Sequence, residues 1–98
     1  MARETVIAEL RSHEKEIRAL GARSLFLFGS VLQGTARKNS DVDLFIDYYR
    51  NRKFSLIDLM RLKYFLEALL GNRVDLLTRD GIHRRLRDRI IADAVKVF

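Results

Sequence analysis

Residues 41–47, Asp-Val-Asp-Leu-Phe-Ile-Asp, are the part of the sequence that most constrains the fold, because their side chains alternate between two sides. Along an extended chain, Val42, Leu44 and Ile46 point one way, and Asp41, Asp43, Phe45 and Asp47 point the other. The apolar side needs a core to cover it, whereas an unpaired carboxylate is costly to bury. We therefore expect a β-strand with one core face and one acidic face.

Two further segments have the length and composition of β-strands. Residues 25–28, Leu-Phe-Leu-Phe, form a continuous apolar run that ends at Gly29, which is typical of a strand buried on both faces. Residues 73–77 also have strand character, and they place Asp75 opposite their apolar neighbours. The sequence thus predicts three strands, two of which carry carboxylates.

Three amphipathic helices are predicted around these strands. Apolar residues spaced by three and four from Val6 to Leu20 predict a helix that ends at Gly21. A second helix runs from Ser55, its N-cap with Asp58 three residues on, to Gly71. Asp80 is a candidate cap for the last helix. The expected apolar face of that helix comprises Ile82, Leu86, Ile90, Ala94 and Val97.

The order of elements predicts a small α/β layered domain. A short helical turn over 31–33 and a loop over 34–40 join the first two strands, which gives helix, strand, short helix, strand, helix, strand, helix. Ninety-eight residues allow one compact core, so we expect residues 1–98 to form a single domain.

Composition limits the partners and the chemistry. The 19 Lys and Arg residues exceed the 13 Asp and Glu residues, and the net charge of +6 favours a nucleotide, a nucleic acid or an acidic protein surface. The chain has no cysteine and two histidines, so any bound metal must use oxygen ligands. No run of 18 apolar residues occurs, and we expect a cytoplasmic protein without a membrane partner.

The candidate site is the pattern Gly29-Ser30, ten intervening residues, then Asp41-Val42-Asp43. Glycine after a buried strand lets a phosphate approach the backbone, and serine at a helix start adds a hydroxyl donor beside free N–H groups. Two carboxylates at i and i+2 of a strand project from one face, roughly 6 to 7 Å apart at Cα, and can share hard cations. Because Mg²⁺ is usually held by one or two carboxylates plus substrate phosphates, the pattern predicts a magnesium–nucleotide site.

Three other side chains lie near this pattern. Asp75 is either a third acid, which two-metal sites need to orient or deprotonate the attacking oxygen, or the partner of Arg73 or of a neighbouring helix. Arg37 either contacts phosphates through its planar fork of donors or is a solvated loop residue. Asp47 shares the acidic face, and we expect it in solvent at the strand end.

The segment 29–44, Gly-Ser-Val-Leu-Gln-Gly-Thr-Ala-Arg-Lys-Asn-Ser-Asp-Val-Asp-Leu, resembles the signature of the minimal nucleotidyltransferases of the DNA polymerase beta-like superfamily. The resemblance covers essentially the whole chain, including its length, the order of its elements and its third acid. It implies a small mixed β-sheet flanked by helices, with ATP as substrate and two Mg²⁺ ions. Such proteins are commonly antitoxins that transfer AMP to a tyrosine of a paired all-helical HEPN ribonuclease.

The resemblance also implies roles for individual residues. The metals would be held by Asp41 and Asp43, with Asp75 as third ligand or base, and the phosphates by Gly29 and Ser30. The chain departs from its relatives at Gln33, where a basic residue is common, and at Lys38-Asn39, where Pro-Asp or Glu-Asp is common. These departures leave the metal ligands intact but affect the detailed phosphate contacts.

Three functions are therefore considered. The favoured one is magnesium-dependent transfer of AMP to a protein hydroxyl by an antitoxin. The second is a non-catalytic antitoxin that masks its toxin by binding, and the intact carboxylates argue against it. The third is nucleotidyl transfer to RNA or a small molecule, and the lack of a second domain to hold such an acceptor argues against it.

Two surfaces are candidates for contact with a partner. On the helix from Ser55, one apolar arc comprises Leu59, Leu62, Leu66, Leu69 and Leu70, and a second stripe comprises Ile57, Met60 and Tyr64. The second stripe either faces another chain, in a homo- or hetero-oligomer, or is buried within the domain. The last helix is basic through Arg84, Arg85, Arg87 and Arg89. That helix could bind RNA or an acidic protein, but a solvated face is favoured.

Overall fold

The computed structural model describes residues 2–37 and 39–98, so Lys38, in the expected loop, lies outside the described residues. Four strands form one mixed sheet in the order β3-β2-β1-β4. The strands are β1 (Ala22–Phe28), β2 (Val42–Tyr48), β3 (Val74–Thr78) and β4 (Val95–Lys96). β1 is antiparallel to β2 and β4, whereas β2 is parallel to β3. This confirms the expected fold class, a small mixed sheet flanked by helices.

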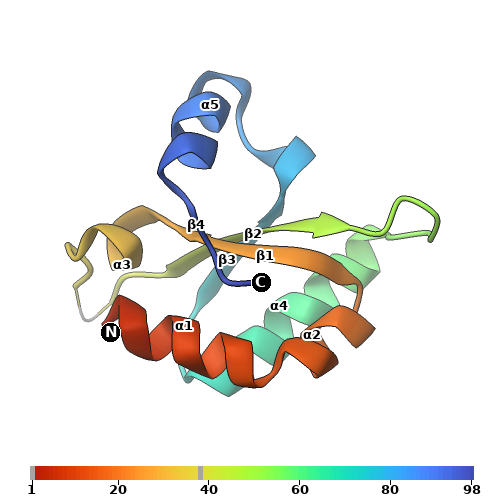
Figure 1. The fold of residues 1–98 in the computed structure, drawn as a ribbon, viewed down its shortest axis with the longest axis horizontal. Coiled ribbons are helices and arrows are strands. Elements are labelled where there is room, and N and C mark those ends of the chain that lie inside the picture. Colours follow the sequence, from red (N-terminus) through yellow and green to blue (C-terminus); the bar gives the residue numbers. More distant parts are fainter. Residues whose placement is uncertain (1, 38) are drawn as a thin grey trace.

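Helices lie on both faces of this sheet (Figure 1). They are α1 (Arg3–Ser12), α2 (Glu14–Ala19), α3 (Gly29–Gln33), α4 (Leu56–Leu70) and α5 (Arg84–Asp93), with a 3₁₀ turn, η1, at Arg79–Gly81. α1, α2 and α4 cover one face, α5 stands over the other, and α3 follows the end of β1. Among the residues described, no helix combines the length and apolar content that crossing a bilayer requires.

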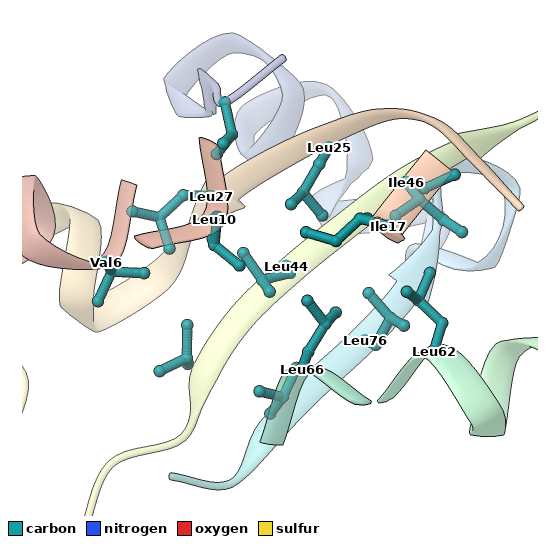
Figure 2. Packing of buried hydrophobic residues seen from close by; sticks show 14 of the residues in the cluster. Val6, Leu10, Ile17, Leu25, Leu27, Leu44, Ile46, Leu62, Leu66 and Leu76 are labelled. Atoms are coloured by element: carbon teal, nitrogen blue, oxygen red, sulfur yellow. The ribbon is translucent and has the colours of Figure 1, made fainter. Parts of the chain in front are cut away.

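The main core lies between the sheet and α1, α2 and α4 (Figure 2). The alternation along residues 41–47 is confirmed, because Val42, Leu44 and Ile46 are completely buried in it. Helix α4 contributes the arc expected from its sequence: Leu62 and Leu66 are fully buried, and Leu59, Leu69 and Leu70 pack against the same cluster.

A second, smaller apolar cluster forms on the opposite face of the sheet. Phe45 is fully buried there together with Phe28 and Ile82. Ile90 and Ile91 of α5 pack against this cluster, and so does Ala94, which directly follows the helix. The face expected to be acidic is therefore divided: its aromatic centre is covered by α5, and its carboxylates lie toward the two ends of β2.

The first helix is interrupted, whereas the sequence predicts one continuous helix up to Gly21. His13 leaves the helical conformation, with φ −114° and ψ 22°, and separates α1 from α2. The Ser12 hydroxyl donates to the Glu9 carbonyl at 2.7 Å, which competes with the backbone hydrogen bonds of the helix. The apolar periodicity survives the break, because Leu10 and Ile17 both reach the core.

The helix α4 begins and ends as its sequence predicts. The Ser55 hydroxyl accepts from the Asp58 N–H, and the Asp58 carboxylate accepts from the Ser55 N–H at 2.8 Å, which completes a capping box. The helix ends at Gly71, whose φ of +64° is the left-handed conformation that glycine adopts readily.

The end of the chain differs from the prediction. Asp80 lies in the η1 turn and does not cap α5, whose N-cap is His83, with its ring nitrogen accepting from the Arg85 N–H. The helix also stops at Asp93, so Ile82 precedes it and Val97 follows it. The chain then forms β4, a strand that the sequence did not predict, and pairs along β1.

Candidate functional site

The register of the sheet brings two of the three expected acids side by side. Asp43 on β2 is the direct partner of Asp75 on β3 in the parallel ladder. Adjacent strands lie about 4.8 Å apart, and both side chains leave the face opposite the main core. Asp75 is exposed and Asp43 is partly buried. The fold thus places two carboxylates from distant parts of the chain at one point.

Gly29 allows the chain to pass close to Asp43. It follows β1 directly after Phe28, the residue paired with Asp43 across the antiparallel ladder. Its φ is +74°, and a Cβ added there would overlap the Asp43 carboxylate. The sequence predicts a glycine that admits a phosphate, and the structure gives this glycine a second reason, the approach of a protein carboxylate.

The surroundings of Asp43 disfavour its charged form. Burial, followed by the charges of Asp75 and Asp41, raises the pKa of Asp43 to about 6, and a hydrogen bond from the Ser30 backbone N–H acts in the opposite direction. The N–H of Ser30 is thus directed at Asp43, although the sequence assigns that helix start to phosphate. A cation placed among these acids would relieve their repulsion.

Asp41 lies immediately before β2, beside Arg73. Its Oδ1 is 3.1 Å from Arg73 Nε, so Arg73 pairs with Asp41 and not with Asp75. The same Oδ1 is shielded from solvent and accepts no hydrogen bond from the residues described. Arg73 therefore engages this oxygen, while the Asp41 side chain as a whole stays 44% exposed.

These acids fit a magnesium ion in their chemistry, although they do not form a finished cage. Within residues 2–37 and 39–98, no three His, Cys, Asp or Glu side chains are already arranged as a metal site. Mg²⁺ normally takes one or two carboxylates and completes its shell with water and substrate phosphates. The half-exposed carboxylate of Asp41 and the raised pKa of Asp43 match that requirement.

Arg37 is exposed in the loop between α3 and β2. Its backbone N–H donates to the Ser40 hydroxyl at 2.9 Å, which helps to order the approach to Asp41. A role for its guanidinium in binding phosphate stays a prediction.

A cavity of about 610 Å³ opens beside Gly29, between the end of β1 and α5. Its lining comprises Phe28, Gly29, Gln33, Thr35, Leu86, Arg89, Ile90 and Asp93. Sequence reasoning did not place α5 at the site, because only the packing of Ile90, Ile91 and Ala94 on the sheet brings that helix over the end of β1. The helical periodicity of α5 shows that it has an apolar face but not which part of the sheet it covers.

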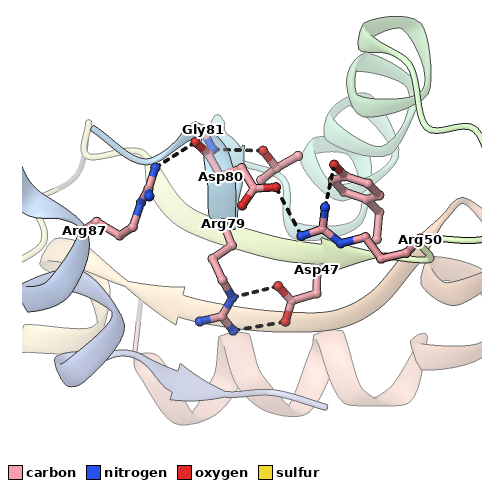
Figure 3. A network of polar contacts seen from close by, with 8 residues as sticks. Asp47, Arg50, Arg79, Asp80, Gly81 and Arg87 are labelled. Carbon is pink, nitrogen blue, oxygen red and sulfur yellow. Dashed lines mark hydrogen bonds and ion pairs between the residues drawn. The ribbon is translucent and has the colours of Figure 1, made fainter. Parts of the chain in front are cut away.

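Asp47 is not the solvated residue that the sequence predicts. Its two carboxylate oxygens accept from Arg79 Nε and Nη2 at 2.8 and 3.0 Å (Figure 3). The Arg79 guanidinium, which lowers the pKa of Asp47, also lies 5.1 and 5.2 Å from the ring centroids of Phe26 and Phe45. This acid is therefore engaged in a structural pair and is separate from the Asp41, Asp43 and Asp75 group.

Comparison with known proteins identifies the family of this chain. Residues 10–97 match the family model of the nucleotidyltransferase domain. Protein adenylyltransferase MntA of Thermococcus cleftensis is 35% identical over 96% of this chain and 94% of its own length. A protein of Methanocaldococcus jannaschii, named as a candidate protein adenylyltransferase, is 42% identical over 80% of this chain and 82% of its own.

Solved structures give the same result. A candidate minimal nucleotidyltransferase has a TM-score of 0.80 and 38% identity, and the match covers 97% of this chain and 95% of the other. A toxin–antitoxin complex with AMP-PNP has a TM-score of 0.72 and 22% identity, and the match covers 90% of this chain and 72% of the other. A complex of tri-AMPylated Shewanella oneidensis HEPN toxin with its MNT antitoxin has a TM-score of 0.64 and 16% identity, and the match covers 90% of this chain and 68% of the other. The last two share the fold alone at these identities, whereas the family match and the relatives above 30% identity show that the chain belongs to the minimal nucleotidyltransferases.

Proposed function

We propose that this protein transfers AMP from ATP to a tyrosine hydroxyl of a cognate HEPN ribonuclease and thereby acts as its antitoxin. The names of the relatives support the transfer of an adenylyl group to protein, since both carry the name protein adenylyltransferase. Structures with the same fold are toxin–antitoxin complexes, one with AMP-PNP and one with an AMPylated HEPN toxin.

The observation that carries the proposal is the parallel pairing of Asp43 with Asp75 directly beside Gly29. A chain that served only to mask a toxin would have no need of a partly buried carboxylate beside two others, because burial and then repulsion make the charged form of Asp43 less favourable in the folded state. Such a cost is typical of a site kept for its chemistry.

The metal in this proposal is Mg²⁺, held by Asp41 and Asp43 with Asp75 beside them. When bound, it would supply charge neutralisation for the triphosphate and for the oxygens that attack and leave. The backbone around Gly29 and the Ser30 hydroxyl would hold the phosphates against these acids.

The reaction then follows from the arrangement of the chain's own groups. The acceptor oxygen forms a bond to the α-phosphorus of ATP, and the bond between that phosphorus and the oxygen bridging to the β-phosphate breaks. Pyrophosphate leaves, and the hydroxyl proton passes to the exposed carboxylate of Asp75. The backbone around Gly29 and the Ser30 hydroxyl hold the nucleotide in line for the attack, with Asp41 and Asp43 as the residues that would hold the metal. Orientation of this kind accounts for much of a catalyst's effect.

Co-expression with the product of the adjacent gene, followed by mass spectrometry of both chains, tests the proposal. We expect the partner to gain AMP on tyrosine when ATP and Mg²⁺ are supplied, and to gain none with the Asp41→Asn variant. Asp88→Asn, which removes an exposed carboxylate of α5, is the matched control and should transfer normally.

Two results would contradict the proposal. An unmodified partner that is nevertheless inhibited in a stable complex would assign the protein to the masking antitoxins. Efficient labelling of RNA or a small molecule by the protein alone would assign it to the other class of transferase.

A further inference from the structure

The cavity beside Gly29 borders the proposed phosphate site. Gly29 contributes to both, since it lines the cavity and its backbone passes against the Asp43 carboxylate. A nucleotide whose phosphates lie at Gly29 and Ser30 must send its base and sugar away from the carboxylates. The cavity offers a walled space in which they can lie.

We infer that this cavity is the nucleobase pocket and that α5 forms its outer wall, with Leu86 contacting the base. The inference rests on the proposed function, because it assumes that a nucleotide binds at Gly29. It assigns to α5 the recognition of a small-molecule substrate, whereas the sequence favours a solvated face for that helix.

The volume and the lining of the cavity suit a nucleobase. Its volume of about 610 Å³ lies within the usual range of small-molecule pockets, roughly 300 to 1,000 Å³. Three other cavities on the described surface hold about 160 to 200 Å³ each. The apolar part of the lining comes from Phe28, Leu86 and Ile90, and the polar part from side chains that can reach the edge of a base. Such a combination is typical of ligand pockets, where apolar contact supplies affinity and a few polar groups fix orientation.

Leu86 is the residue that most needs explanation. It is 53% exposed, one of few large apolar side chains in the described structure with so much of their surface in water. Ile90 lies one helical turn further on, so the two share a face of α5, yet Ile90 also packs into the second apolar cluster. Leu86 therefore extends an apolar wall beyond the core and into the cavity.

The polar residues of the lining come from both sides of the cavity. Gln33 and Thr35 are contributed by α3 and the residues after it, whereas Arg89 and Asp93 are contributed by α5. All four are exposed, so their amide, hydroxyl, guanidinium and carboxylate groups are open to the cavity's contents. Together they provide donors and acceptors for a heterocycle with both kinds of group on its edge.

Isothermal titration calorimetry with two probes tests the inference. AMP-PNP reports on base and phosphates together, and inorganic tripolyphosphate, which has no base, reports on the phosphates alone. With MgCl₂ present, Leu86→Ala should weaken AMP-PNP binding about fivefold, because the apolar contact with the base is lost. Binding of tripolyphosphate should stay within about twofold of the parent protein.

Leu56→Ala is the matched control, since Leu56 is 73% exposed at the start of α4 and does not line this cavity. It should leave the binding of both probes unchanged. Because Leu86 is largely exposed, its truncation should also leave the melting temperature near that of the parent, which circular dichroism would verify.

The outcomes separate the two proposals. If the parent protein binds neither probe, the proposed function fails. If the parent binds AMP-PNP but Leu86→Ala weakens both probes equally, or neither, then α5 does not hold the base and the inference is overturned.

Discussion

Replacing Asp43 with asparagine is expected to stabilise the metal-free protein while abolishing transfer of AMP. The pKa of Asp43 is about 6 in the folded protein, against an ordinary value of 3.8. A raised pKa means that the folded protein holds this proton more tightly than the unfolded chain does. The free energy of unfolding therefore falls as the pH rises from about 4 to 6, and the loss is complete above the folded pKa.

The size of this effect follows from the two pKa values. The interval between 3.8 and about 6 corresponds to about 3 kcal/mol. Asp43 is only partly buried, and solvent screens its interactions with Asp41 and Asp75, so we expect roughly 1 kcal/mol. In a domain of this size, such a gain raises the melting temperature by about 4 to 8 °C. Asparagine keeps an oxygen that can accept from the Ser30 N–H, so the local hydrogen bond survives.

Thermal unfolding followed by circular dichroism in EDTA, at pH 8 and at pH 4, measures this effect. The variant should melt above the parent at pH 8 and close to it at pH 4, where the parent carboxyl is already protonated. Asp88→Asn, on the exposed side of α5, should show no such gain. Added Mg²⁺ and ATP should then stabilise the parent and not Asp43→Asn. A melting temperature at pH 8 that is equal to or below the parent's would refute the idea that burial of the charged Asp43 and its repulsion by Asp75 and Asp41 cost folding energy.

Four further variants, of which Gly34→Ala is a control, separate the contributions of neighbouring groups. Urea unfolding should show that Gly29→Ala lowers the free energy of unfolding by about 2 to 3 kcal/mol, because its backbone is left-handed and the new Cβ overlaps Asp43. Gly34 also has a left-handed backbone, with φ +75°, but open space around it, so Gly34→Ala should cost only about 1 kcal/mol in the same assay. Equal losses would show that the approach to Asp43 is not tight. Asp47→Asn should lower the free energy of unfolding by about 1 to 2 kcal/mol at pH 7. Because Arg79 lowers the pKa of Asp47, the difference in unfolding free energy between variant and parent should disappear as the pH falls below 4 in the same assay. Ser30→Ala should raise the Michaelis constant for ATP with little change in melting temperature, and unchanged kinetics would exclude its hydroxyl from phosphate binding.

Much of the fold could be predicted because periodicity and capping are local. The alternation of 41–47 assigned Val42, Leu44 and Ile46 to the core, and Ser55 with Asp58 marked the start of α4. The break at His13 could not be predicted in this way, since it depends on a side chain competing with backbone hydrogen bonds. Strand β4 was also missed, because a strand of two residues has no periodicity to detect.

The candidate site also has features that follow from local sequence and features that arise from packing. The spacing from Gly29 to Asp43 predicts which residues form the site, and the sheet register places Asp75 beside Asp43. The ion pair of Arg73 with Asp41, the pairing of Asp47 with Arg79 and the wall formed by α5 arise from packing between distant segments. Sequence spacing carries no information about such contacts, so the shape of the pocket around the carboxylates could not be predicted from it.

The parallel pairing of β2 with β3 also bears on the order in which the protein folds. β1 and β2 are antiparallel and nearly consecutive, whereas Asp43 meets Asp75 only after α4 has crossed the sheet. Loop closure makes such non-local pairing slower, so β1 and β2 should acquire amide protection before β3 in pulse-labelling hydrogen exchange. The chain has no proline, so isomerisation of prolyl bonds cannot obscure the sequence of events. A nascent chain would then acquire its acidic pair, and with it any competence for catalysis, in the last stage of folding.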